Sequence, residues 1–294
     1  SSVNSLASAA FPLPFTPQGS DISEQLEAHR DQFIGGNFLV VAYDGARHTN
    51  VRYLLSRMFT PTRLKANAQF MKEYADQLVR EAVARGKCEL INEIASPYVT
   101  MVIADLLGVS AADRELFRAV IDGGQVAGSI ENTEKPTAES SLEYMAGFFV
   151  RYIEERAANP GADLLSELAT ATYPDGSKPD LAELVSLSAF MFAAGQDTSA
   201  KLLGNAMRYI VDMPGLQQQL REDRELVPWL IEEVLRLEGS TKATHRVARR
   251  DTRIGDVKVP AGKRIIVALA AGNRDPRQWG EDAGDFVLER RKIR

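Results

Sequence analysis

The stretch Phe190–Ser199, which reads FMFAAGQDTS, decides the fold of this chain. It lies within Asp180–Met213, a run without proline that is far longer than the roughly 11–12 residues of a mean helix. Asp180 can cap a helix, Glu183 completes a start like a capping box, and Pro214 ends the run. We therefore predict one long helix over about 180–213 that threads the core.

The polar residues in the middle of this helix interrupt an apolar sequence. Leu184–Ala194 is apolar on nearly every face, which is typical of a helix buried on all sides. Burying the Asp197 carboxylate without partners costs several kcal/mol, and Gly195 costs about 1 kcal/mol relative to alanine. One interpretation is functional, because glycine lets a planar ligand approach the backbone and a hydroxyl can open a local bulge. The other is a kinked helix with Asp197 turned to a water pocket or a neighbouring arginine.

The rest of the chain predicts helices followed by a small β region. Apolar spacing and punctuation by proline and glycine indicate helices over 21–33, 48–84 with a break at Thr60-Pro61, 91–107, 112–120, 139–157, 164–172 and 228–237. Period-two alternation then predicts a β-hairpin at about 252–268, with strands Arg253–Val259 and Arg264–Val267 joined by Pro260–Gly262. The fold class is therefore mainly α.

Composition excludes several classes of protein. A net charge of −5 over 294 residues argues against a nucleic-acid surface, and no apolar run is long enough to span a membrane. The single cysteine, Cys88, excludes a disulfide framework, and the three histidines stand in no metal-binding spacing. We expect a soluble cytoplasmic protein with small-molecule chemistry. The chain does not begin with methionine and stops at Arg294, so both ends are expected to be cuts.

Ala194-Gly195-Gln196-Asp197-Thr198 resembles the oxygen-binding signature in the long central helix of cytochromes P-450. The resemblance implies the mainly α P-450 fold, incomplete here, and haem b as cofactor. By that resemblance Ala194 and Gly195 would lie against the haem and Thr198 would hydrogen-bond the oxygen that the iron binds. Asp197 would help relay protons from solvent, so Asp197 and Thr198 are the expected catalytic pair.

Further motifs follow in the order that this family keeps. Glu233 and Arg236 resemble its glutamate-x-x-arginine pair, and Phe286–Arg290 resembles the stretch that supplies a second arginine, Arg290, to a structural network. Asn273–Pro276 resembles the family's turn after the hairpin.

Three residues resemble ligands of the haem propionates: His48 and Arg52, four positions apart on one helix face, and Arg246. The alternative for each is a solvated surface charge.

The resemblance also implies a single incomplete domain over 1–294, with a substrate-gate loop over 1–45, a helical body over 46–240, and a hairpin and following turn over 241–294. The gate could be lined by Phe11, Phe15, Phe33 and Phe38, although such aromatics are more often core. The iron-binding cysteine is expected beyond Arg294. Cys88, in a polar stretch, is expected to be a spare thiol.

The implied function is that of a bacterial haem-dependent monooxygenase. It would hydroxylate a small apolar substrate with O2, using electrons from an acidic ferredoxin-type donor. The docking face for that donor would be the basic cluster of Arg47, Arg52, Arg57, Arg63, Lys65, Arg249 and Arg250. One alternative is a catalytically inactive helical fragment that serves as a scaffold or interaction module. Another is haem chemistry without monooxygenation, such as that of a peroxide-driven or rearranging relative.

Overall fold

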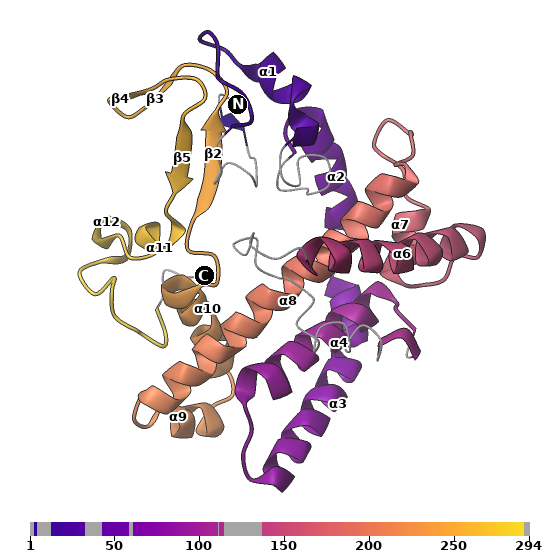
Figure 1. The fold of residues 1–294 in the computed structure, drawn as a ribbon. Helices are drawn as coiled ribbons and strands as arrows, with labels where there is room; N and C mark the ends of the chain where they lie inside the picture. The colour runs from indigo at the N-terminus through magenta and orange to yellow at the C-terminus, as the bar shows by residue number, and fades with distance from the viewer. Residues whose placement is uncertain are drawn as a thin grey trace. The chain divides into compact units, whose positions relative to one another are not determined.

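The computed structural model describes residues 3–4, 13–32, 43–58, 61–110, 112–114 and 137–290. They divide into two compact units. Unit 1 consists of Ser1–Tyr74, Thr100–Ala194 and His245–Ile266, and unit 2 of Ala75–Val99, Gly195–Thr244 and Val267–Arg294. Helices dominate both units (Figure 1), so the predicted mainly α fold class is confirmed.

Unit 1 is built around a core of helices. Its helical elements are α1 (Ser23–Ala28), η2 (Arg30–Gln32), α2 (Gly45–Met58), most of α4 (Ser96–Leu107), α6 (Thr137–Ala158), α7 (Leu164–Ala169), and the first parts of α3 (Pro61–Arg85) and α8 (Leu181–Asp212). The core includes Val51, Leu107, Phe149, Leu165 and Phe192, each at most 2% exposed. The break predicted at Thr60-Pro61 separates α2 from α3, and Pro61 is the first residue of α3.

The start of α8 follows from its sequence. The Asp180 carboxylate accepts a hydrogen bond from the Glu183 amide at 2.7 Å, as in an N-cap. The Glu183 carboxylate accepts a hydrogen bond from the Tyr173 hydroxyl, a contact outside the helix start. The helix then continues for 32 residues, close to the predicted length.

The strands form two small sheets. β2 (Thr244–Ala248) lies between β1 (Val3–Asn4) and β5 (Arg264–Val267) in one sheet, and β3 (Thr252–Ile254) pairs with β4 (Val257–Val259) in the other. The predicted hairpin is therefore present at its place in the chain but was wrong in its pairing. The first predicted strand folds back on itself around Gly255-Asp256, where Gly255 has a φ of +56°. A two-residue loop of this kind twists in the sense that antiparallel strands require.

Unit 2 has a separate apolar core. Its elements are the π-helical turn η4 (Ile91–Ala95), α9 (Leu216–Glu222), α10 (Leu226–Glu238), α11 (Leu269–Gly272), α12 (Pro276–Trp279), and the second parts of α3 and α8. Ala206 of α8 packs with Leu216 of α9 and with Leu230 and Val234 of α10.

Several of the predicted features lie outside the described residues. Most of the helix predicted over 112–120 lies outside the described residues, as do Phe11, Phe33 and Phe38 of the predicted gate. Phe15 packs against the cluster of Ile22, Leu26 and Val247, which is its alternative role as a core residue. The division into a gate, a helical body and a hairpin region stays a prediction.

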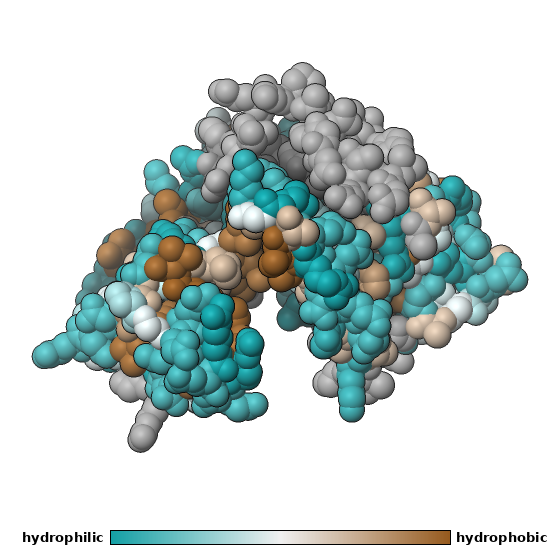
Figure 2. Space-filling model, turned by 90° about the horizontal axis from the view of Figure 1, so that it is seen from below, coloured by the Kyte–Doolittle hydropathy of each residue, from teal (hydrophilic) through white to brown (hydrophobic). Residues whose placement is uncertain are grey.

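The described surface is mixed in polarity. Hydrophilic residues predominate on the face in Figure 2, and apolar residues gather on it in patches. Exposed large apolar side chains of the described residues include Val79 and Val83 of α3 and Val211 of α8. None of the described helices is long and apolar enough to cross a membrane.

Candidate functional site

The acid and alcohol of the quoted stretch lie in an unbroken part of α8. Ala194 and Thr198 are exposed, and Gly195 and Asp197 are partly exposed. The α-helix continues through these positions, so the bulge expected from the hydroxyl is not observed. The Asp197 carboxylate is 2.6 Å from the Lys201 ammonium, one turn further along the helix, and the Asp197 side chain is 32% exposed. The burial predicted for this carboxylate is therefore only partial, and its cationic neighbour is a lysine on the same helix.

The backbone of Thr198 contacts a residue that is far away in the sequence. The Ser240 hydroxyl, in the segment after α10, donates a hydrogen bond of 2.6 Å to the Thr198 carbonyl oxygen. No sequence pattern indicated Ser240, because it stands 42 positions after Thr198 in an irregular segment.

Two of the three expected propionate ligands share one helix face. His48 and Arg52 are both exposed and lie one turn apart on α2. Among the described residues, neither side chain has a hydrogen-bond or ion-pair partner. Arg246 lies on β2, is partly buried, and donates a hydrogen bond of 2.8 Å to the His245 carbonyl. All three belong to unit 1, whereas Asp197 and Thr198 belong to unit 2.

Glu233, Arg236 and Arg290 come together in a buried network. The Glu233 carboxylate, 0% exposed, is 2.8 Å from the Arg236 guanidinium and 3.1 Å from that of Arg290. Arg236 also donates to the carbonyls of Asn273, Ala283 and Asp285. A planar guanidinium presents several donors in fixed directions, so these acceptors hold the segment after α11 against α10.

The network also sets the ionisation of Glu233. Burial raises the pKa of the Glu233 carboxyl, but the hydrogen bonds from Arg236, the Val287 backbone amide and Arg290 together lower it by more than burial raises it. The resulting pKa lies below the ordinary value of a glutamate. Glu233 is therefore a structural anion that binds two arginines.

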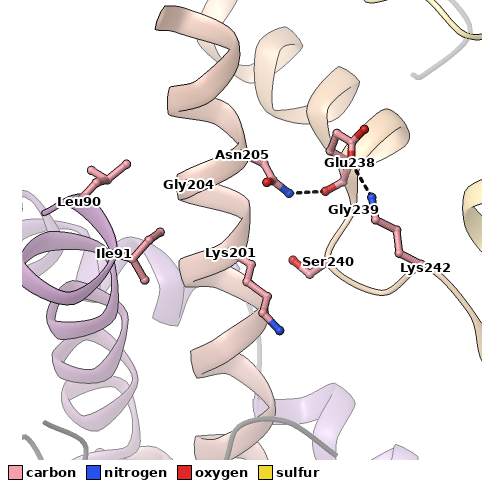
Figure 3. A pocket seen from close by; sticks show the side chains of 9 residues that line it. All are labelled: Leu90, Ile91, Lys201, Gly204, Asn205, Glu238, Gly239, Ser240 and Lys242. Atoms are coloured by element: carbon pink, nitrogen blue, oxygen red, sulfur yellow. Dashed lines mark hydrogen bonds and ion pairs between the residues drawn. The ribbon is translucent and has the colours of Figure 1, made fainter. Parts of the chain in front are cut away.

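A pocket that no sequence pattern indicated lies beside α8 in unit 2 (Figure 3). Its volume is about 530 Å³, and its lining is Leu90, Ile91, Lys201, Gly204, Asn205, Glu238, Gly239, Ser240 and Lys242. The first two side chains lie on one side of α8, and Asn205 points toward Glu238 on the other. A Cβ atom on Gly204 would come within 2.7 Å of the Ile91 Cδ1 atom, so glycine permits the close approach of η4.

The only cysteine of the sequence, Cys88, is exposed in the turn between α3 and η4. Among the described residues no group of three histidine, cysteine, aspartate or glutamate side chains could hold a metal ion.

Comparison with known proteins identifies the family. The family model described as Cytochrome P450 matches residues 132–291. Cytochrome P450 130 of Mycobacterium tuberculosis is 31% identical over 258 residues, which cover 85% of this chain and 62% of that protein. Cytochrome P450 monooxygenase PikC of Streptomyces venezuelae is 30% identical over 246 residues, which cover 83% of this chain and 58% of that protein.

Solved structures agree with the sequence comparison. The substrate-free form of cytochrome P450 CYP150A6 from Mycobacterium marinum has a TM-score of 0.89 and 42% identity, covering 99% of this chain and 68% of that one. CYP109E1 from Bacillus megaterium, in complex with corticosterone, has a TM-score of 0.79 and 26% identity, with 87% and 69% covered. The chain spans about three fifths of the length of the curated relatives that it matches. The resemblance seen in the sequence is confirmed, and the chain belongs to the cytochrome P450 family.

Proposed function

We propose that the protein containing this chain is a haem-dependent monooxygenase. It inserts one atom of O2 into a C–H bond of a small apolar substrate, while two electrons and two protons reduce the other atom to water. The observation that carries the proposal is the Asp197-Thr198 pair in the middle of α8, one turn after the small residues Ala194 and Gly195.

Haem is the cofactor of the cytochrome P450 family, and when bound it supplies the activation of O2. The donor set of unit 1 fits its two propionates. His48 and Arg52 present an imidazole and a guanidinium on one face of α2, and both are exposed. Charge-assisted hydrogen bonds from such donors to carboxylates are short and strong, and Arg246 would add a third donor.

The chain's own residues have separate tasks in this proposal. Ala194 and Gly195 carry almost no side chain, so a flat group can approach the backbone of α8 closely. The Thr198 hydroxyl would hold a hydrogen bond beside that group. The Asp197 carboxylate, partly exposed and paired with Lys201, exchanges protons with solvent and passes them toward Thr198.

The iron ligand is proposed to come from a part of the protein outside this chain. Cys88 is a poor candidate because it is exposed in a turn and no group around it suggests a ligand role. The chain spans only about three fifths of its curated relatives, so a cysteine elsewhere in the protein is compatible with the comparisons.

The substrate class, the electron donor and the compartment are also part of the proposal. A solved relative, CYP109E1, binds corticosterone and testosterone, which supports an apolar substrate class. An acidic ferredoxin-type protein is the proposed donor, because Lys65 and Arg250 are exposed on unit 1 and would attract it. The side chains of Arg57 and Arg63 lie outside the described residues. The reducing cytoplasm is the proposed compartment, since the sequence has one cysteine.

The test is the absorbance spectrum of the protein expressed from its natural reading frame, reduced with dithionite and bound to carbon monoxide. We expect the red-shifted Soret band of thiolate ligation. A haem band typical of nitrogen ligation, or none, overturns the proposal in favour of an inactive scaffold. In the same preparation His48→Ala/Arg52→Ala is expected to retain less haem than wild type, and Arg80→Ala, an exposed change on α3, to retain as much.

A further inference from the structure

The segment Glu238–Ser240, at the end of α10, makes two hydrogen bonds to one face of α8. The Ser240 hydroxyl donates to the Thr198 carbonyl at 2.6 Å. The side-chain amide of Asn205 donates to the Glu238 backbone carbonyl at 2.7 Å (Figure 3). Thr198 and Asn205 are seven positions apart, about two helical turns, and therefore lie on the same face. Two contacts on one face fix both the rotation and the axial position of this part of α8.

The bond to Thr198 acts on a peptide in the interior of a helix. In an α-helix the carbonyl of residue i already accepts a hydrogen bond from the amide of residue i+4. A carbonyl oxygen has a second lone pair, and an outside donor that uses it draws the carbonyl away from the helix axis. The Ser240 bond therefore restrains the peptide between Thr198 and Ser199, which is joined to the Cα atom that carries the Thr198 side chain.

The donor is itself held in place independently of Thr198. Gly239 lies close against the last turn of α10, since a Cβ atom on it would be 2.6 Å from the Leu235 carbonyl oxygen. The Glu238 carboxylate is 2.7 Å from the Lys242 ammonium and 2.9 Å from the Arg274 guanidinium. The segment is thus anchored to α10 and to the residues after α11, and it can impose a position on α8.

We propose that Ser240 is a positioning residue, whose hydroxyl sets the orientation of Thr198 in α8. The inference rests on the proposed function, since Thr198 is the group through which Ser240 acts. Ser240 does not touch substrate or cofactor in this proposal. Its effect is on the hydrogen bond that Thr198 holds, and therefore on how completely oxygen is reduced to water and not released as hydrogen peroxide.

The experiment compares Ser240→Ala, Ser240→Thr and the control Thr170→Val in the holoenzyme. Thr170 is a matched control, because its exposed hydroxyl also donates to a helix carbonyl, that of Ser166, at 2.8 Å. The first readout is amide hydrogen exchange of the peptide that covers residues 195–205. The second is hydrogen peroxide released per NADPH consumed without substrate, with a plant-type ferredoxin and its reductase as donor.

We expect Ser240→Ala to speed exchange in this peptide about 5-fold or more and to raise peroxide per NADPH about 2-fold, at an unchanged carbon monoxide band. Ser240→Thr is expected to restore both values toward wild type, and Thr170→Val to change neither. Faster exchange without more peroxide in Ser240→Ala means a merely structural contact and overturns the inference, as does no change in either readout. Wild type without the thiolate band refutes the proposed function itself, and the inference falls with it.

Discussion

Glu233 and Arg290 stand 57 positions apart in the sequence and form a buried ion pair of 3.1 Å. Neither side chain is more than 6% exposed. The pair joins α10 to the end of the described chain, and Arg236 completes it from the same helix as Glu233. A buried ion pair of this kind contributes little to stability relative to apolar residues of equal volume. Removing one of its partners does reduce stability, because the charge that remains loses compensation.

The first prediction concerns the stability of this network. Arg290→Met leaves the Glu233 carboxylate paired with Arg236 alone, and we expect the free energy of unfolding to fall by about 1.5–3 kcal/mol, the range for a hydrogen bond to a charged group. Urea denaturation followed by circular dichroism measures the change. The control is Arg277→Met, because the Arg277 side chain is 90% exposed in its ion pair with Asp275, and a change within about 0.5 kcal/mol is expected. Equal losses in both variants would contradict the assigned role of Arg290.

A second prediction is the pH dependence of the same network. The folded-state pKa of Glu233 is lowered, so its stabilising effect is complete above the ordinary glutamate value of about 4.3 and is lost as pH falls through the lowered pKa. Between pH 6 and pH 3 the urea midpoint of wild type should therefore fall more steeply than that of Glu233→Gln, which has no carboxyl to protonate. Parallel pH profiles would show that Glu233 titrates alike in the folded and unfolded states.

The close approach of Gly204 and Ile91 gives a third prediction. Gly204→Ala gains about 1 kcal/mol of helix propensity but brings its Cβ within 2.7 Å of Ile91 Cδ1. Ile91→Val removes that Cδ1 atom. We expect the double variant to be more stable than the sum of the single changes by about 1 kcal/mol, within the range of coupling between residues in contact. Additive effects in a double-mutant cycle of urea midpoints would mean that η4 does not approach α8 this closely.

The fourth prediction separates the Asp197 carboxylate from its ion pair. Asp197→Asn removes a group that can carry a proton, and ferredoxin-supported NADPH oxidation should slow by about 10²-fold, with a larger ratio of rates in H2O and D2O. Lys201→Gln breaks the 2.6 Å ion pair but leaves the carboxylate, so its rate should stay within a few-fold of wild type. If Lys201→Gln lowers the rate of NADPH oxidation as much as Asp197→Asn does, the rate depends on the ion pair and not on a proton carried by Asp197.

Local sequence patterns predicted the helical framework well. The cap at Asp180, the proline after Met213 and the break at Thr60-Pro61 each depend on residues within one or two turns, and the structure places helix ends close to them. The spacing of His48 and Arg52 likewise places them on one face of α2 without further information. The hairpin failed in its pairing, because the Gly255-Asp256 turn was missed and β5 pairs with a strand from before the turn.

The sequence by itself determined the class of fold, the long helix α8, and the residue types that identify the family, because these depend on local periodicity and on short motifs. Only the tertiary structure decided that Ser240 donates to Thr198, that Lys201 pairs with Asp197 on a partly exposed face, and that Glu233 holds Arg290. The physical reason is that burial and the direction of hydrogen bonds depend on which elements pack together. Contacts across 42 or 57 positions have no period in the sequence that would predict them.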